Sequence, residues 1–181
     1  MERNLALIAL FAALIAVLGL VPTITLMSGV PISAQSLGVM LCGTVLGAKR
    51  GLLAVLLLEL VVALGVPALA GGRGGLGVFF GPTVGFLIGW PIAAFVAGLV
   101  TEKLRSAPLV AAASIGAFLG GVIALYIPGI IGMAVMLDKT LAEAIALVLP
   151  FIPGDLIKVV LAGLITSGLA RARPAAVLSR G

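Results

Sequence analysis

The chain has 181 residues, of which 62% are hydrophobic and only 9% are charged. Soluble domains carry about 25% charged residues, so this composition excludes a soluble protein and predicts one integral membrane domain over residues 1–181. The chain has no histidine, which excludes Ser-His and Cys-His catalysis and His-ligated metal sites. We therefore expect no enzymatic activity, metal or cofactor. The net charge of +5 does not indicate nucleic-acid binding, because the basic residues lie at the ends of apolar segments.

Apolar segments predict an all-α membrane fold with six membrane-spanning helices. In chain order, these spans cover approximately residues 5–21, 36–48, 52–66, 83–100, 109–131 and 155–170. A shorter helix is expected at 141–149, since Thr140 and Glu143 fit a capping box. Pro128 is expected to kink or end the fifth span.

Small residues mark the first span. Ala9 and Ala13 stand four residues apart, as do Ala12 and Ala16. This spacing brings both members of a pair onto one helix face and lets another helix approach closely. The neighbour is either a helix of the same bundle or a helix of another subunit.

Polar side chains are few in the second and third spans. Ser33, Gln35 and Ser36 lie at the start of the second span, where helix capping is the ordinary interpretation. Glu59 lies near the middle of the third span. An ionisable side chain within a membrane is costly and needs a partner, for which Lys158 is the candidate.

The connection from Pro67 to Pro82 is rich in glycine, apolar, and carries one arginine, Arg73. It lacks the Gly-Lys-Ser/Thr ending of a phosphate-binding loop. A passive flexible linker would normally be polar. We therefore favour a cap that folds onto the membrane domain or over a ligand.

The last span begins with Pro153 and Gly154, followed by Asp155 and, three residues later, Lys158. Residues at i and i+3 share one face of a helix. Ionisable groups inside a membrane segment usually face a cavity or a partner and so indicate a functional site. The alternative is that Asp155 caps the helix while Lys158 extends to the nearby interface.

Basic residues predict the orientation, because Lys and Arg concentrate on the cytoplasmic side of membrane proteins. An even number of spans places both termini on one side. Eight basic residues then fall on that side, namely Arg3, Lys49, Arg50, Lys103, Arg105, Arg171, Arg173 and Arg180. Arg73 and Lys139 fall on the other. We therefore place both termini in the cytoplasm and the glycine-rich loop outside.

This orientation gathers Arg73, Asp155 and Lys158 near the outer face, with Glu59 somewhat deeper. Together they predict a polar pocket for a small, partly apolar ligand with an anionic end. Either Arg73 or Lys158 would hold a carboxylate, and Asp155 would accept hydrogen bonds from ligand N–H groups.

Six stretches match a known family in their order and spacing. They are the alanine-rich residues 6–16, Val-Pro-Ile-Ser-Ala-Gln-Ser-Leu-Gly-Val at 30–39, Gly-Val-Pro at 65–67, Ala-Gly-Gly-Arg-Gly-Gly-Leu-Gly at 70–77, Gly-Pro-Thr-x-Gly at 81–85 and Pro-Gly-Asp-x-x-Lys at 153–158. The chain thereby resembles BioY, the biotin-binding S component of energy-coupling factor (ECF) vitamin transporters. The resemblance runs from residue 5 to 170, and the glycine loop together with the last motif makes it specific.

The resemblance implies a multi-pass protein of a prokaryotic cell membrane that captures biotin at the outer face. Its partners would be a transmembrane coupling subunit and two cytoplasmic ATPase subunits. By the same resemblance, Asp155 and Lys158 would contact biotin at its ureido ring. Arg73 and its loop would close over the ligand or hold its carboxylate, and Gln35 and Thr83 are further candidates for contacts.

The resemblance also implies that the Ala-x-x-x-Ala motif of the first helix docks the coupling subunit, through Ala9 and Ala13. Two departures stand out. Val84 and Phe86 occupy positions where relatives often have Gly and Tyr, and Leu58-Glu59 replaces a usual Tyr-Leu pair. The missing tyrosine hydroxyl would alter one ligand contact.

Two other functions remain open at this point. One is a self-sufficient transporter or facilitator for biotin or another small carboxylate, which would work without coupling subunits. The other is a scaffold membrane protein without a ligand, in which Asp155 and Lys158 would contribute to stability only.

Overall fold

Apolar segments in a membrane fold as helices because lipid offers no partner for unsatisfied backbone groups. The computed structural model describes residues 2–25 and 28–180. Its longer elements are α1 (Glu2–Leu18), α2 (Gln35–Leu46), α3 (Ala48–Ala63), α4 (Val84–Lys103), α5 (Leu109–Phe118), the π-helical η2 (Leu119–Ala124), α6 (Leu125–Met136), α7 (Leu141–Val148) and α8 (Ile152–Ala172). The expected all-α fold class is confirmed.

Short elements connect these helices. They are the two-residue antiparallel strands β1 (Ile24–Thr25) and β2 (Pro31–Ile32), and the 3₁₀ turns η1 (Leu76–Phe80), η3 (Leu149–Phe151), η4 (Pro174–Ala176) and η5 (Leu178–Arg180). The strand pair was not predicted, and it precedes α2 at the start of the second span. The predicted capping box at α7 is present, since the Thr140 hydroxyl accepts from the Glu143 N–H and the Glu143 carboxylate accepts from the Thr140 N–H.

The six expected spans correspond to α1, α2, α3, α4, the continuous segment from α5 to α6, and α8. Among the described residues, three helical segments are long and apolar enough to cross a membrane by length and composition, namely Val84–Lys103, Leu109–Met136 and Leu141–Ala172. Helices α1, α2 and α3 are shorter, with 17, 12 and 16 residues.

The fifth span does not end at Pro128 but continues as a helix to Met136. The π-helical turn η2 ends at Ala124, and the carbonyl of Ala124 is the one that the Pro128 ring would crowd in a regular α-helix. A wider turn at this place relieves that crowding. The last span also begins three residues earlier than expected, because Pro153 lies in the first turn of α8, where proline is tolerated.

Helix α4 lies at the centre of the bundle, where it packs against α2, α3, α5 and α6. Close approach depends on small residues. A side chain at Gly43 of α2 would collide with the Ala94 carbonyl of α4, and one at Gly85 of α4 would collide with the Pro128 carbonyl of α6. Backbone-to-backbone contact of this kind is the usual way in which membrane helices associate.

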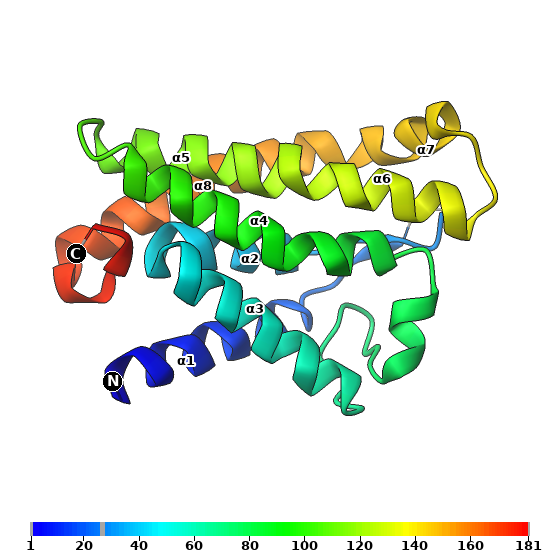
Figure 1. The fold of residues 1–181 in the computed structure, drawn as a ribbon, viewed down its shortest axis with the longest axis horizontal. Helices are drawn as coiled ribbons and strands as arrows, with labels where there is room; N and C mark the ends of the chain where they lie inside the picture. Colours follow the sequence, from blue (N-terminus) through cyan, green and yellow to red (C-terminus); the bar gives the residue numbers. More distant parts are fainter. Residues whose placement is uncertain (1, 26–27, 181) are drawn as a thin grey trace.

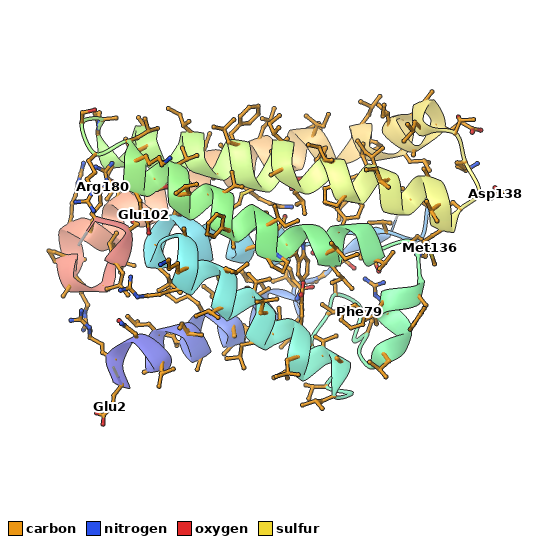
Figure 2. The ribbon with its side chains drawn as sticks, in the orientation of Figure 1. Glu2, Phe79, Glu102, Met136, Asp138 and Arg180 are labelled. Atoms are coloured by element: carbon orange, nitrogen blue, oxygen red, sulfur yellow. The ribbon has the colours of Figure 1, made fainter. Side chains whose placement is uncertain are left out.

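Both termini lie at the same end of the bundle, and the glycine-rich loop and α7 lie toward the opposite end (Figure 1). Glu102 and Arg180 lie at the end that carries the termini, whereas Met136 and Asp138 lie at the other (Figure 2). This arrangement agrees with an even number of spans. The assignment of the terminal end to the cytoplasm stays a prediction.

The C-terminal segment is folded onto the bundle. The Ser179 hydroxyl donates to the Thr44 carbonyl oxygen at 2.6 Å, and the Arg180 guanidinium donates to the carbonyl oxygens of Leu104 and Arg105 at 3.0 and 2.8 Å. Arg180 thereby caps carbonyl groups that follow the end of α4, where a positive charge also complements the helix dipole.

Candidate small-molecule binding site

A pocket lies at the end of the bundle opposite the termini. Its empty volume is about 560 Å³, part of which is open to solvent. The lining residues are Val30, Pro31, Ser33, Gln35, Ser36, Leu69, Ala70, Arg73, Thr83, Phe86, Leu87, Trp90, Leu125, Phe151, Asp155 and Lys158. All five predicted binding residues are among them, so the structure brings together side chains from α2, the glycine-rich loop, the start of α4 and α8.

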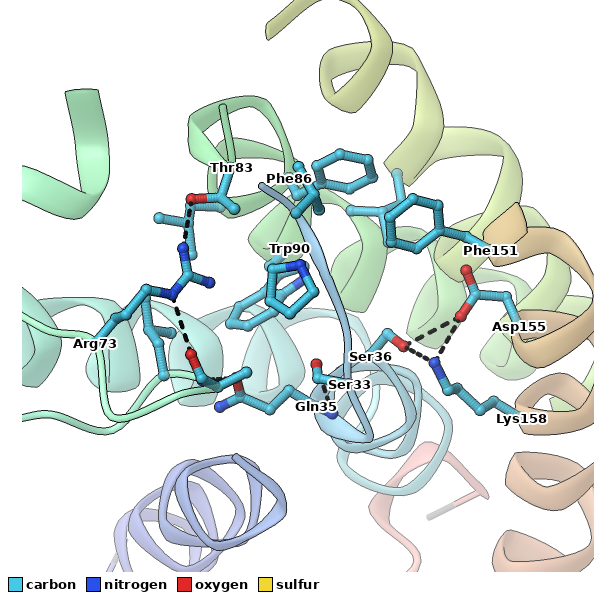
Figure 3. A pocket seen from close by; sticks show the side chains of 16 residues that line it. Ser33, Gln35, Ser36, Arg73, Thr83, Phe86, Trp90, Phe151, Asp155 and Lys158 are labelled. Atoms are coloured by element: carbon cyan, nitrogen blue, oxygen red, sulfur yellow. Dashed lines mark hydrogen bonds and ion pairs between the residues drawn. The ribbon is translucent and has the colours of Figure 1, made fainter. Parts of the chain in front are cut away.

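Asp155 and Lys158 form a buried ion pair at one side of the pocket (Figure 3). The Lys158 Nζ lies 2.9 Å from Asp155 Oδ1, and the two side chains are 14% and 6% exposed, respectively. Asp155 lies in the first turn of α8, where the helix dipole favours a negative charge. The predicted i, i+3 geometry is therefore present, and both charges face a cavity and not the interface.

Two neutral side chains complete this cluster. The Ser36 hydroxyl of α2 accepts from Lys158 Nζ at 2.8 Å and donates to Asp155 Oδ1 at 3.2 Å. The Tyr126 hydroxyl of α6 donates to Asp155 Oδ2 at 2.6 Å. Buried charges are costly unless they are paired and hydrogen-bonded, so the four side chains stabilise one another.

The cluster keeps one donor and one acceptor available. Among the described residues, the Asp155 carboxylate accepts three hydrogen bonds and Lys158 donates two. An ionised carboxylate has about four acceptor sites and an ammonium group has three donors. A ligand group that presents an N–H next to a carbonyl oxygen would satisfy both.

Arg73 lies across the pocket from this cluster (Figure 3). Its Nε donates to the Ala70 carbonyl oxygen at 3.0 Å, and its Nη1 donates to Thr83 Oγ1 at 3.5 Å. Within residues 2–25 and 28–180, no carboxylate lies within ion-pair distance of Arg73. Partial burial lowers the pKa of the Arg73 guanidinium, but the group stays charged because arginine is not deprotonated in proteins. The guanidinium is therefore suited to bind an anion.

Gln35 lines the pocket, but its amide is committed to the backbone. Its Nε2 donates to the carbonyl oxygens of Ile15 and Ala68 at 3.0 and 2.9 Å, and its Oε1 accepts from the Ala70 N–H at 2.8 Å. Both amide hydrogens are thus used, and the side chain ties α1, α2 and the glycine-rich loop together. A structural role accounts for these contacts, whereas the capping role expected from its position is absent.

Aromatic side chains lie between the two polar ends of the pocket. Trp90 lies between Arg73 and the Asp155 cluster in Figure 3. The rings of Phe86 and Phe151 stack with centroids 6.0 Å apart. These aromatic surfaces provide an apolar wall for the middle of a ligand.

Sequence reasoning missed Tyr126 and the aromatic wall. Tyr126 is the only tyrosine in the chain, and a phenol in an apolar segment needs a hydrogen-bond partner when it is buried, which is a signal that was available. Its ring meets that of Phe86 edge-on, with centroids 6.4 Å apart. A tyrosine hydroxyl therefore reaches this cluster from α6, although Phe86 lacks one.

The expected pairing of Glu59 with Lys158 is wrong, because Lys158 pairs with Asp155. Glu59 does not line the pocket, and its Oε1 is buried without a hydrogen-bond partner among the described residues. Helix α3 packs on α1, α2 and α4, whereas α8 packs on α2 and α5. The two residues lie on helices that are not packed neighbours.

The alanine pairs of α1 differ in exposure. Ala9 and Ala13 are exposed, whereas Ala12 is buried and Ala16 is half-buried. The Ala12–Ala16 pair therefore packs within the bundle, and the Ala9–Ala13 pair lies on its outer surface.

The chain is similar to known proteins over nearly its whole length. The model of the BioY family matches residues 2–175. A "Biotin transporter BioY" of Rhodobacter capsulatus is 57% identical over 100% of both chains, and one of Rhizobium etli is 49% identical over 90% of each chain. The crystal structure of the "S-component for biotin from an ECF-type ABC transporter" is similar with a TM-score of 0.88 at 32% identity, over 94% of this chain and 92% of that chain.

The hydrogen bond between Tyr126 and Asp155 generates a test of the cluster. Tyr126→Phe should lower the free energy of unfolding in detergent by about 1.5–3 kcal/mol, because it removes a hydrogen bond to a buried charged group. In an Asp155→Asn background, Tyr126→Phe should lower the free energy of unfolding much less. A double-mutant cycle measures this difference. Equal costs in the two backgrounds would show that the hydroxyl does not act through Asp155.

Proposed function

The chain belongs to the BioY family, and on this premise we propose that it captures biotin at the outer membrane face as the substrate-binding subunit of an ECF-type, ATP-driven importer. It is a multi-pass prokaryotic membrane protein whose relatives are transporters and not enzymes. The observation that carries the proposal is the two-ended pocket, with Arg73 on one side and the Asp155–Lys158 pair on the other.

The chemistry of biotin fits the groups that the pocket leaves available. Its cyclic urea presents N–H donors beside a carbonyl oxygen, which match the acceptor of Asp155 and the donor of Lys158. Its aliphatic chain would lie along Trp90 and Phe86. Its carboxylate would bind the Arg73 guanidinium, which has planar donors suited to a carboxylate.

The proposed coupling to ATPases rests on α1. Ala9 and Ala13 expose a small-residue face that another membrane helix can approach closely. A transmembrane coupling subunit would dock there and connect this protein to two cytoplasmic ATPase subunits.

Biotin binding to the purified protein, measured by calorimetry, tests the ligand and the cluster. Asp155→Asn and Lys158→Ala should each weaken binding about 10- to 100-fold, because each removes a charge-assisted hydrogen bond. Asp138→Asn and Lys139→Ala are matched controls, since both residues are exposed near the same end of the bundle and lie outside the pocket. Absence of biotin binding by the unaltered protein would exclude the proposed ligand.

A ligand analogue tests the role of Arg73. Arg73→Gln should weaken biotin binding about 10- to 100-fold, since the carboxylate loses a charged partner. The same substitution should leave the binding of biotinamide, which carries no carboxylate charge, within about twofold. If Arg73→Gln weakens the binding of biotin and of biotinamide by the same factor, Arg73 acts through the fold of its loop and not through the ligand carboxylate.

Uptake experiments distinguish an importer subunit from a self-sufficient facilitator. The double substitution Ala9→Leu/Ala13→Leu should abolish biotin uptake by cells while calorimetric binding persists, because leucine side chains prevent close helix approach. Ala142→Leu, at an exposed alanine of α7, is the control and should leave uptake unchanged. Normal uptake by the α1 variant, or uptake in cells that lack coupling subunits, would favour the facilitator.

A further inference from the structure

A second cavity lies at the end of the bundle that carries the termini, between the start of α3 and the end of α4. Its empty volume is about 780 Å³, part of which is open to solvent, and it is lined by Ala48, Lys49, Arg50, Phe95, Leu99 and Glu102. We propose that this cavity binds the phosphate headgroup of an anionic phospholipid from the cytoplasmic leaflet. The site is separate from the biotin pocket in its residues and does not depend on the proposed ligand.

The charges of the cavity favour an anion. Lys49 is exposed and Arg50 is half-buried. In the described part of the chain, neither has a carboxylate within ion-pair distance, and the one contact of the Arg50 guanidinium is a long 3.4 Å hydrogen bond to the Leu46 carbonyl oxygen. The two cations therefore lie at the cavity with most of their donors available.

Glu102 is the opposing charge at this site. Its Oε1 accepts a 2.9 Å hydrogen bond from the backbone N–H of Ala48, which holds the carboxylate at the start of α3. The side chains that line the cavity still carry one more positive than negative charge. A phosphodiester, with a single negative charge, balances that excess.

Apolar side chains extend from this cavity along both helices. On α3, Leu53, Leu56 and Leu60 follow Lys49 at intervals of four, three and four residues and are 49%, 43% and 57% exposed. On α4, Ile88 and Ile92 precede Phe95 and Leu99 at the same intervals and are 57% and 45% exposed. This spacing places each set on one helix face, and α3 packs on α4.

The combination of these features favours a phospholipid over a soluble anion. A free phosphate would use only the two cations, whereas an acyl chain would also cover the apolar faces that lead from the cavity toward the middle of the membrane. Basic residues next to a membrane surface attract anionic lipids, and here a cavity with an aromatic and an aliphatic wall accompanies them.

The test uses the full chain purified in a neutral detergent, with bound lipid counted by native mass spectrometry. The unaltered protein should retain phosphatidylglycerol at least tenfold better than phosphatidylcholine with the same acyl chains. Lys49→Gln/Arg50→Gln should remove this preference while the helical circular-dichroism spectrum, as a check of folding, stays unchanged. Equal retention of the two lipids by the unaltered protein would overturn the proposal without any variant.

A matched control separates the cavity from general surface charge. Arg171→Gln/Arg173→Gln removes the same charge at the same end of the bundle, from exposed residues outside the cavity, and should keep the preference. If this control loses the lipid equally, the cavity is not the site. A separate arm adds inorganic phosphate or glycerol 3-phosphate, which should not displace phosphatidylglycerol at millimolar concentration; displacement would indicate a soluble-anion site and contradict the lipid assignment.

Discussion

The buried ion pair between Asp155 and Lys158 is the constraint on which the outer half of the structure depends. Two opposite charges that are largely buried are costly unless they are paired and hydrogen-bonded. Ser36 from α2 and Tyr126 from α6 supply those additional bonds. The pair therefore connects three helices, and it leaves one donor and one acceptor on residues that line the pocket.

The position of Arg73 depends on a second constraint, the backbone of the glycine-rich loop. Gly71 and Gly72 adopt φ values of +76° and +69°, in the left-handed region that other residues rarely occupy. This turn directs the loop back so that the Leu69 N–H donates to the Arg73 carbonyl oxygen at 3.0 Å. The loop thereby places a cation opposite the ion pair, and the separation of the two polar groups by aromatic rings suits a ligand with a polar head, an apolar middle and a carboxylate.

Much of this arrangement could be predicted from sequence, because charges are rare in the chain and each one is informative. Asp155, Lys158 and Arg73 were recognisable as isolated ionisable residues in apolar surroundings. Tyr126 is recognisable as a phenol that needs a partner, but that partner lies 29 positions away in sequence and no periodic pattern indicates which residue it is. The wrong pairing of Glu59 has the same origin, because helical periodicity tells which face is apolar but not which helices are neighbours. A π-helical turn precedes Pro128 in the structure, and neither this turn nor the continuation of α6 to Met136 has a sequence signature here.

Gln35 connects the ligand pocket with the helix that carries the exposed alanines. Its amide holds the Ile15 carbonyl oxygen of α1 and, on the loop, the Ala68 carbonyl oxygen and the Ala70 N–H. The residue is 1% exposed, and breaking a hydrogen bond of a buried polar group is costly. Any movement of this loop would either carry α1 with it or break a hydrogen bond of the buried amide, at a cost of about 1–3 kcal/mol. Gln35 thus joins the loop that carries Arg73 to the helix that carries the exposed Ala9–Ala13 face.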